Sequence, residues 1–227
     1  EMQPVVDELL DHYLRDGAAF EGQEQAVLVV VALDARERVG RLIELLDHER
    51  QEVAIRAAWG LQQLAREPGE LAAIFEYCQR WTERLVRGDA SLPVADTDVF
   101  RMAFLFQALG RNRYAQADAM FRLYVPKQGQ KMRPNTRAAA IWALGEIWGG
   151  SLESGLEDEL MQRLMDMDPV NPEELQVQYA AAIALGRFGN PKSLPGLRAA
   201  PFEPSTPLGI ASRWAAEQIE EAMASEN

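Results

Sequence analysis

The apolar residues of this chain recur with the period of an α-helix. Between residues 53 and 64, apolar or small side chains stand at positions i, i+4, i+7, i+8 and i+11, which places them on one face of a helix. Two later segments repeat this spacing. Small middle residues let neighbouring helix backbones approach closely, so the pattern predicts stacked helices. The three sets are Val53, Ala57, Gly60, Leu61 and Leu64; Thr136, Ala140, Ala143, Leu144 and Ile147; and Val177, Ala181, Ala184, Leu185 and Phe188.

The same positions define an internal repeat. Six segments end their apolar pattern on an anchor residue, and successive anchors lie 28, 48, 35, 41 and 34 residues apart. Such irregular spacing suits a unit of two helices joined by variable loops. The anchors are Leu33, Leu61, Leu109, Leu144, Leu185 and, more loosely, Ile219.

A second helix is expected before each anchor helix. Asp47 and Asp166 lie in the intervening turns, where they cap the next helix, and Pro169 stops the preceding one. No segment shows convincing strand alternation. The sequence therefore predicts an all-α protein of twelve helices in six antiparallel pairs. The pairs are 4–15 with 23–33, 36–48 with 51–66, 68–88 with 97–110, 113–125 with 134–148, 154–166 with 173–188, and 191–199 with 207–224.

Two stretches of this sequence resemble a known repeat family. Residues 45–61, LLDHERQEVAIRAAWGL, and residues 180–191, AAAIALGRFGNP, resemble HEAT repeats, particularly the short HEAT-like type found in bilin lyases. The Val-Arg pair usual in the family is matched loosely by Thr136-Arg137 and is absent at Val177-Gln178. The resemblance implies a right-handed α-solenoid of about six HEAT-like helix pairs, forming one domain over residues 1–227. The resemblance also implies a surface that binds other proteins, and it does not by itself imply catalysis.

Composition and charge narrow the class of protein. The chain is 48% hydrophobic and 26% charged, which is typical of a folded protein. Its net charge of −12 argues against a protein that coats nucleic acid over its whole surface. The longest apolar run, residues 26–33, is too short to span a membrane. The chain begins with Glu1, so we expect a processed form or a piece of a longer protein, and we expect a cytoplasmic location.

Candidate chemistry is sparse. The single cysteine, Cys78, lies in an aromatic helical stretch where a cysteine usually behaves as a small buried hydrophobe. His12 and His48 supply too few ligands for a metal site. Paired glycines at 149–150 lie at an expected helix end, where glycine serves as a cap. We therefore predict no catalytic residue, no metal and no cofactor.

Basic residues concentrate in the middle of an otherwise acidic chain. Residues 51–145 carry a net charge of +4, between ends of −7 and −9. Between 101 and 137, only Asp118 opposes the basic side chains. Such a block suits an acidic peptide, a phosphate-bearing ligand or a nucleic-acid backbone, and the alternative is that these charges merely solvate a loop and helix ends. The candidate binding residues in it are Arg101, Arg111, Arg113, Lys127, Lys131, Arg133 and Arg137.

Two tryptophans occupy the same place in their repeats. Trp59 and Trp142 each stand two residues before the anchor leucine. Helical geometry turns them about 120° from the core face, where they border the expected concave surface or pack between repeats. Trp81, Trp148 and Trp214 have no such counterpart and are expected in the core.

We therefore predict a non-enzymatic scaffold that binds another protein along the concave surface. The partner is expected to carry an acidic patch that faces the basic segment 101–137 and the tryptophan pair. Two alternatives remain from the sequence. One is a nucleic-acid-binding HEAT-repeat protein that uses the same segment, which the net charge disfavours. The other is a lyase or chaperone-like HEAT protein acting on a chromoprotein, for which no catalytic residue is assigned.

Overall fold

The computed structural model describes residues 3–88, 96–127 and 132–225, and over these residues the chain is helical without a β-strand. The helices follow the predicted pairs closely, and the predicted fold class is confirmed. They are α1 (Gln3–Leu14), α2 (Phe20–Ala32), α3 (Val39–Glu44), α4 (Gln51–Leu64), α5 (Pro68–Arg87), α6 (Asp96–Arg111), α7 (Asp118–Arg122), α8 (Pro134–Ile147), α9 (Glu157–Met165), α10 (Leu175–Phe188), α11 (Leu194–Ala199) and α12 (Pro207–Ser225).

The first helix of a pair differs from the prediction in three repeats. A single 3₁₀ turn precedes the α-helix at residues 36–38, 115–117 and 191–193, so α3, α7 and α11 are short. In all three repeats the preceding loop contains a residue with positive φ, namely Asp34 (φ 50°), Arg113 (φ 48°) or Gly189 (φ 71°), and in the third repeat Pro191 begins the turn. The hydrophobic period alone does not separate a 3₁₀ turn from the α-helix that follows it.

The chain forms two compact units. The first comprises Glu1–Arg84 and Asp89–Leu109, and the second comprises Leu85–Gly88 and Gly110–Asn227. One continuous domain over residues 1–227 stays a prediction.

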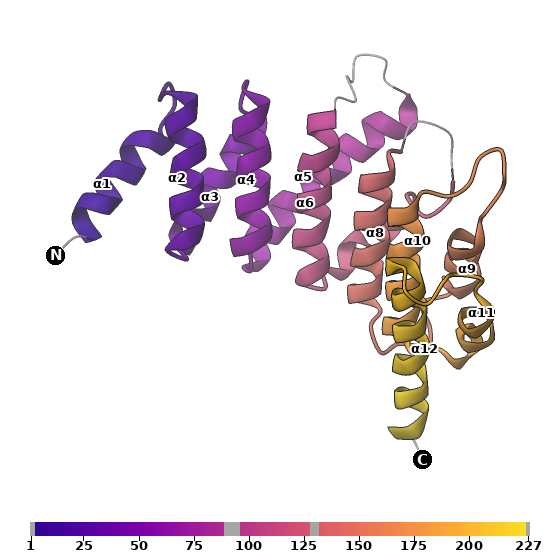
Figure 1. Cartoon of the computed structure of the whole chain (residues 1–227). Helices are drawn as coiled ribbons and strands as arrows, with labels where there is room; N and C mark the ends of the chain where they lie inside the picture. Colours follow the sequence, from indigo (N-terminus) through magenta and orange to yellow (C-terminus); the bar gives the residue numbers. More distant parts are fainter. Residues whose placement is uncertain (1–2, 89–95, 128–131, 226–227) are drawn as a thin grey trace. The chain divides into compact units, whose positions relative to one another are not determined.

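In the first unit, α2 packs against α4, and α1 and α3 lie beside them (Figure 1). Val27, Leu42 and Leu61 are fully buried in this layer. A Cβ added to Gly60 would stand 2.9 Å from Cδ1 of Leu42 and 3.0 Å from Cγ1 of Val27, so a larger residue here would displace the ends of these side chains.

In the second unit, α8, α10 and α12 lie side by side, with α9 against α10 and α11 against α12 (Figure 1). A glycine follows the anchor leucine in three repeats, and each contacts an alanine of the next anchor helix. A Cβ added to Gly110, Gly145 or Gly186 would lie 2.8, 2.9 or 2.7 Å from the Cα of Ala143, Ala184 or Ala215, respectively. The spacing of these helices therefore depends on glycine at each contact.

Candidate functional site

The structure removes Arg137 from the candidate binding surface. Its side chain is 5% exposed and forms two hydrogen bonds with the carboxylate of Glu173, at 2.7 and 2.8 Å. Its remaining donors reach the carbonyl oxygens of Tyr124 and Val125, both at 3.1 Å. This corrects the expectation from the sequence: a guanidinium with all these partners inside the fold anchors the repeat and is closed to a partner protein.

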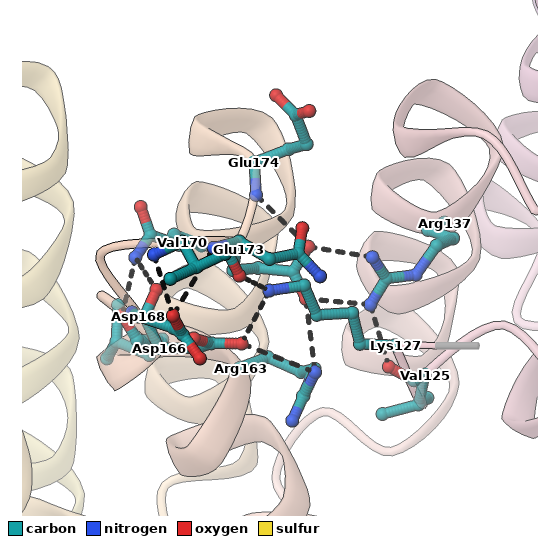
Figure 2. Close-up of polar contacts among 12 residues, drawn as sticks. Val125, Lys127, Arg137, Arg163, Asp166, Asp168, Val170, Glu173 and Glu174 are labelled. Carbon is teal, nitrogen blue, oxygen red and sulfur yellow. Dashed lines mark hydrogen bonds and ion pairs between the residues drawn. The ribbon is translucent and has the colours of Figure 1, made fainter. Parts of the chain in front are cut away.

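Glu173 is the centre of a buried charge network that Figure 2 shows. Arg163 lies 3.3 Å from Glu173 and 3.8 Å from Asp166, and Lys127 donates to Asp166 at 2.9 Å and to the carbonyl of Asn171. Burial by itself raises the pKa of Glu173, but the hydrogen bond and charge of Arg137 outweigh it and hold the pKa below its ordinary value. The network ties the loop between α9 and α10 to the preceding repeat.

Lys127 and Arg101 are also engaged within their own units. Lys127 is half-buried in the network, and its hydrogen bond lowers the pKa of Asp166. In the first unit, Arg101 pairs with Asp98, donates to the carbonyl of Leu46 at 3.1 Å, and lies over the ring of Trp81. Both cations therefore stabilise local structure through ion pairs, whereas the alternative from the sequence was that the block solvates a loop and helix ends.

Three candidate arginines are exposed, and one of them lines a cavity. Arg111, Arg113 and Arg133 are exposed, whereas Lys131 lies outside the described residues. Arg113 shares with Arg187 a cavity of about 430 Å³ at the carboxyl ends of α8 and α10. Gly149, Gly150, Trp214 and Gln218 complete much of its lining.

The cavity concentrates positive charge. Glu146 lies 2.7 Å from Nη2 of Arg187 and is the one acidic residue among the described residues of the lining. The Nη1 atom of Arg187 is buried and has no hydrogen-bond partner among the described residues. Burial and then the like charge of Arg113 lower the pKa of Arg187, against the raising effect of Glu146. An anionic group in the cavity would therefore offset the repulsion between the two guanidinium groups.

The tryptophan pair divides between the two units. Trp59 is half-buried in the first unit, with Arg56 5.7 Å from its ring, and Trp142 is half-buried in the second. Trp142 lies 3.0 Å from the position of a Cβ at Gly110, and Arg187 stands 5.1 Å from its ring. Trp142 therefore packs between repeats, as one of the two sequence alternatives predicts, and Trp214 does the same against Gly186. A shared line of tryptophans stays a prediction.

A second, larger hollow lies where sequence reasoning predicted no site. It has a volume of about 1110 Å³ and lies at the amino ends of α10 and α12. The loop between α9 and α10 forms one side, with Met167, Pro169 and Pro172, and the segment before α12 forms another, with Pro201 and Phe202. The available signal is a set of apolar residues in an otherwise acidic loop, a pattern that the sequence analysis assigns only to a turn.

The other candidate residue for chemistry, the single cysteine, has a structural role. Cys78 is fully buried, and burial raises the pKa of its thiol, which confirms its predicted role as a core residue. The described part of the chain contains no group of three or more His, Cys, Asp or Glu residues arranged to hold a metal ion. Within the same ranges, no helix has the length and apolar character needed to cross a membrane.

Comparison with known proteins identifies the class of fold and then the repeat. The chain is similar to the crystal structure of an engineered protein, at 19% sequence identity and a TM-score of 0.57, over 96% of this chain and 97% of that one. At this identity the likeness shows the fold alone. Residues 127–207 match the family model of HEAT repeats, so this part of the α-solenoid consists of HEAT repeats. No curated protein matches the chain. The likeness to bilin lyases stays a prediction.

Proposed function

We propose that this protein is a non-enzymatic scaffold that binds an acidic segment of another protein at the cavity of Arg113 and Arg187. The observation that carries the proposal is the cavity that Arg113 and Arg187 line together, where Arg187 also has a buried Nη1 atom without a partner among the described residues. A buried donor without an acceptor costs free energy, and a carboxylate from a partner would supply the acceptor. HEAT repeats over residues 127–207 support the general role of a repeat scaffold.

The neighbouring exposed cations extend this proposed contact. Arg111 lies two residues before Arg113 and is exposed, and Arg133 is exposed at the start of α8. We assign them to steering of an acidic partner, because exposed charges affect association rates more than affinity. Trp59 in the first unit and Trp142 in the second remain proposed aromatic contacts, each within its own unit. The cytoplasmic location is likewise proposed on the sequence alone.

The test is a quantitative capture of partner proteins by the full chain and by matched variants. Arg113→Glu places a negative charge in the cavity, and Arg198→Glu makes the same charge change at an exposed site that is not part of the cavity lining. We expect Arg113→Glu to lose a specific acidic partner by about tenfold or more, and Arg198→Glu to retain it. Helicity and melting temperature are compared first, so that unfolding is not mistaken for lost binding.

Equal recovery of the same partners by both variants would overturn the assignment of the cavity. Binding to unrelated DNA with a steep salt dependence that Arg113→Glu abolishes would favour the nucleic-acid alternative instead. Recovery of a pigment-bearing protein that the chain modifies would favour the lyase alternative.

A further inference from the structure

The hollow at the amino ends of α10 and α12 exposes large apolar side chains. Leu175 is 70% exposed, Met167 is 52% exposed and Tyr179 is 46% exposed, and all three line the hollow. Leu175 and Tyr179 are four residues apart on α10, so they share one face of the helix. Clustered exposure of this kind differs from scattered surface leucines and is typical of an interaction site. We call this hollow, with the lining residues given above, the apolar groove.

One wall of the apolar groove is held in place by the charge network of Figure 2. Glu173 lines the groove and is fixed by Arg137, and Asp166 is fixed by Lys127. Between them, the carboxylate of Asp168 accepts hydrogen bonds from the backbone N–H groups of Val170 and Asn171, at 2.8 and 3.3 Å. These bonds give the loop a defined shape before any partner arrives.

The opposite wall is fixed by the turn that starts α12. The hydroxyl of Thr206 donates to the carbonyl of Glu203 at 2.7 Å and accepts from the backbone N–H of Gly209 at 3.1 Å. Pro201 and Pro207 restrict the backbone on either side of this turn. A groove with two ordered walls lowers the entropy cost of binding, because little has to be immobilised when a ligand enters.

The charge around the apolar groove is negative. Asp168, Glu174 and Glu203 are exposed in its lining, and among the described residues the lining contains neither Lys nor Arg. Asp166 and Glu173 add little to this field, because Lys127, Arg137 and Arg163 neutralise them. The groove therefore has an apolar floor of aromatic, aliphatic and proline side chains and an acidic rim.

We infer that the apolar groove binds a segment of a partner protein that presents large apolar side chains flanked by Lys or Arg. The floor supplies apolar area for the central side chains, and the rim attracts the flanking cations and repels acidic segments. This site goes beyond the proposed function, because it lies on different residues from the Arg113–Arg187 cavity and selects the opposite charge.

The experiment uses the full chain to select peptides from a displayed library of random sequences. Selection is repeated on Leu175→Ser and Glu174→Lys, both at exposed positions in the groove. Matched controls are Ile210→Ser, which removes an apolar side chain that is 49% exposed outside the groove, and Glu153→Lys, which makes the same charge change elsewhere. Thermal melting of each variant confirms that it is folded.

The expected result is enrichment of peptides with an apolar centre and Lys or Arg on its flanks. Their affinity should fall by about tenfold or more in Leu175→Ser and in Glu174→Lys, and stay unchanged in the two controls. Hydrogen exchange should slow around residues 166–179 and 200–208 when such a peptide binds.

Three results would overturn the inference. The first is a library with no enrichment that depends on Leu175, and the second is enrichment of acidic flanks. The third is self-association of the chain, or binding to anionic lipid vesicles, that disappears in Leu175→Ser while peptides fail to bind. None of these outcomes depends on Arg113, so failure of the groove and failure of the proposed function are distinguished.

Discussion

The two ends of the helices in the second unit carry opposite charges and different kinds of hollow. At the carboxyl ends of α8 and α10, Arg113 and Arg187 share a small cavity. At the amino ends of α10 and α12, Asp168, Glu174 and Glu203 surround the larger apolar groove. The helix dipole favours cations at carboxyl ends and anions at amino ends, so the sign of charge at each end also stabilises the helices.

The comparison therefore shows that charge alone does not identify a binding site in this fold. What distinguishes the two hollows is a feature that helix stability does not explain. In the cavity this feature is the buried Nη1 of Arg187 without a partner among the described residues, and in the groove it is the exposure of Leu175 and its neighbours. Each has a free-energy cost in the isolated protein, and a suitable partner would remove that cost.

The largest expected effect comes from breaking the network behind the groove. Glu173→Gln leaves the guanidinium of Arg137 buried without a counter-charge, and we expect the free energy of unfolding of the second unit to fall by about 3–5 kcal/mol. Denaturant unfolding measures the change. Because the network holds one wall of the groove and not the cavity, peptide binding at the groove should weaken in conditions where the variant remains folded.

The control for this prediction removes Glu173 together with Arg137 and leaves Arg163 paired with Asp166 at 3.8 Å. Arg137→Met combined with Glu173→Leu replaces the closest buried pair by apolar side chains, and such replacements are often neutral or stabilising. The double variant should therefore recover part of the stability that Glu173→Gln loses. If the single and double variants were equally destabilised, the loss would come from packing rather than from the unpaired charge.

The next effect tests the glycine contacts beside the cavity. Gly186→Ala places a Cβ 2.7 Å from the Cα of Ala215, and we expect a loss of about 1–3 kcal/mol from overpacking. Gly40→Ala serves as the control, because Gly40 is helical and nothing lies within 4 Å of its added Cβ. That control should gain roughly 0.5–1 kcal/mol. Equal behaviour of the two variants in thermal unfolding would contradict the close approach of α10 and α12.

Acid should lower the stability of the second unit by protonating the carboxylates of Glu173 and Asp166. The pKa values of Glu173 and Asp166 lie below their ordinary values of 4.5 and 3.8. Such groups contribute stability above the unfolded pKa and lose that contribution as pH falls through the folded pKa. We therefore expect the stability of the second unit to be nearly constant near neutral pH and to fall below about pH 4.5.

Urea unfolding across this range checks the acid effect. The double variant Arg137→Met with Glu173→Leu lacks the most buried carboxylate, so its stability should fall less steeply with acid than that of the wild type. Parallel slopes in the two proteins would show that other carboxylates dominate the response.

The sequence predicts the repeat well because the signal is redundant. Three copies of the same spacing, which contain Leu61, Leu144 and Leu185, report the same helix face, and all of these leucines are fully buried. The small residues of the pattern also predict close helix contacts, which the approaches of Ala143 to Gly110 and of Ala184 to Gly145 confirm. A 3₁₀ turn before α3 was missed because it shares the local hydrophobic pattern of the helix that it precedes.

The candidate site was harder to predict because its residues depend on partners far away in the chain. Nothing near Arg137 in the sequence indicates that Glu173, 36 residues later, neutralises it. The sequence assigns no role to Arg187, because this residue meets Arg113 only after α8 and α10 have packed. Charge counting along the sequence therefore found the basic block but did not separate buried from exposed cations.

The smallest expected effect separates stability from binding at Arg113. This residue has a φ of 48°, a left-handed conformation that costs a non-glycine residue about 1–2 kcal/mol, whereas glycine adopts it freely. After the greater chain entropy of glycine is subtracted, Arg113→Gly should gain roughly 0.5–1 kcal/mol in stability and still lose the acidic partner.

Asp34→Gly is the matched control, because Asp34 has a φ of 50° in the first unit and should gain similar stability with binding intact. If both variants gain stability but only Arg113→Gly loses the partner, the arginine is retained at a strained position for binding. Unchanged binding in both would instead leave the strain at Arg113 without a functional cause.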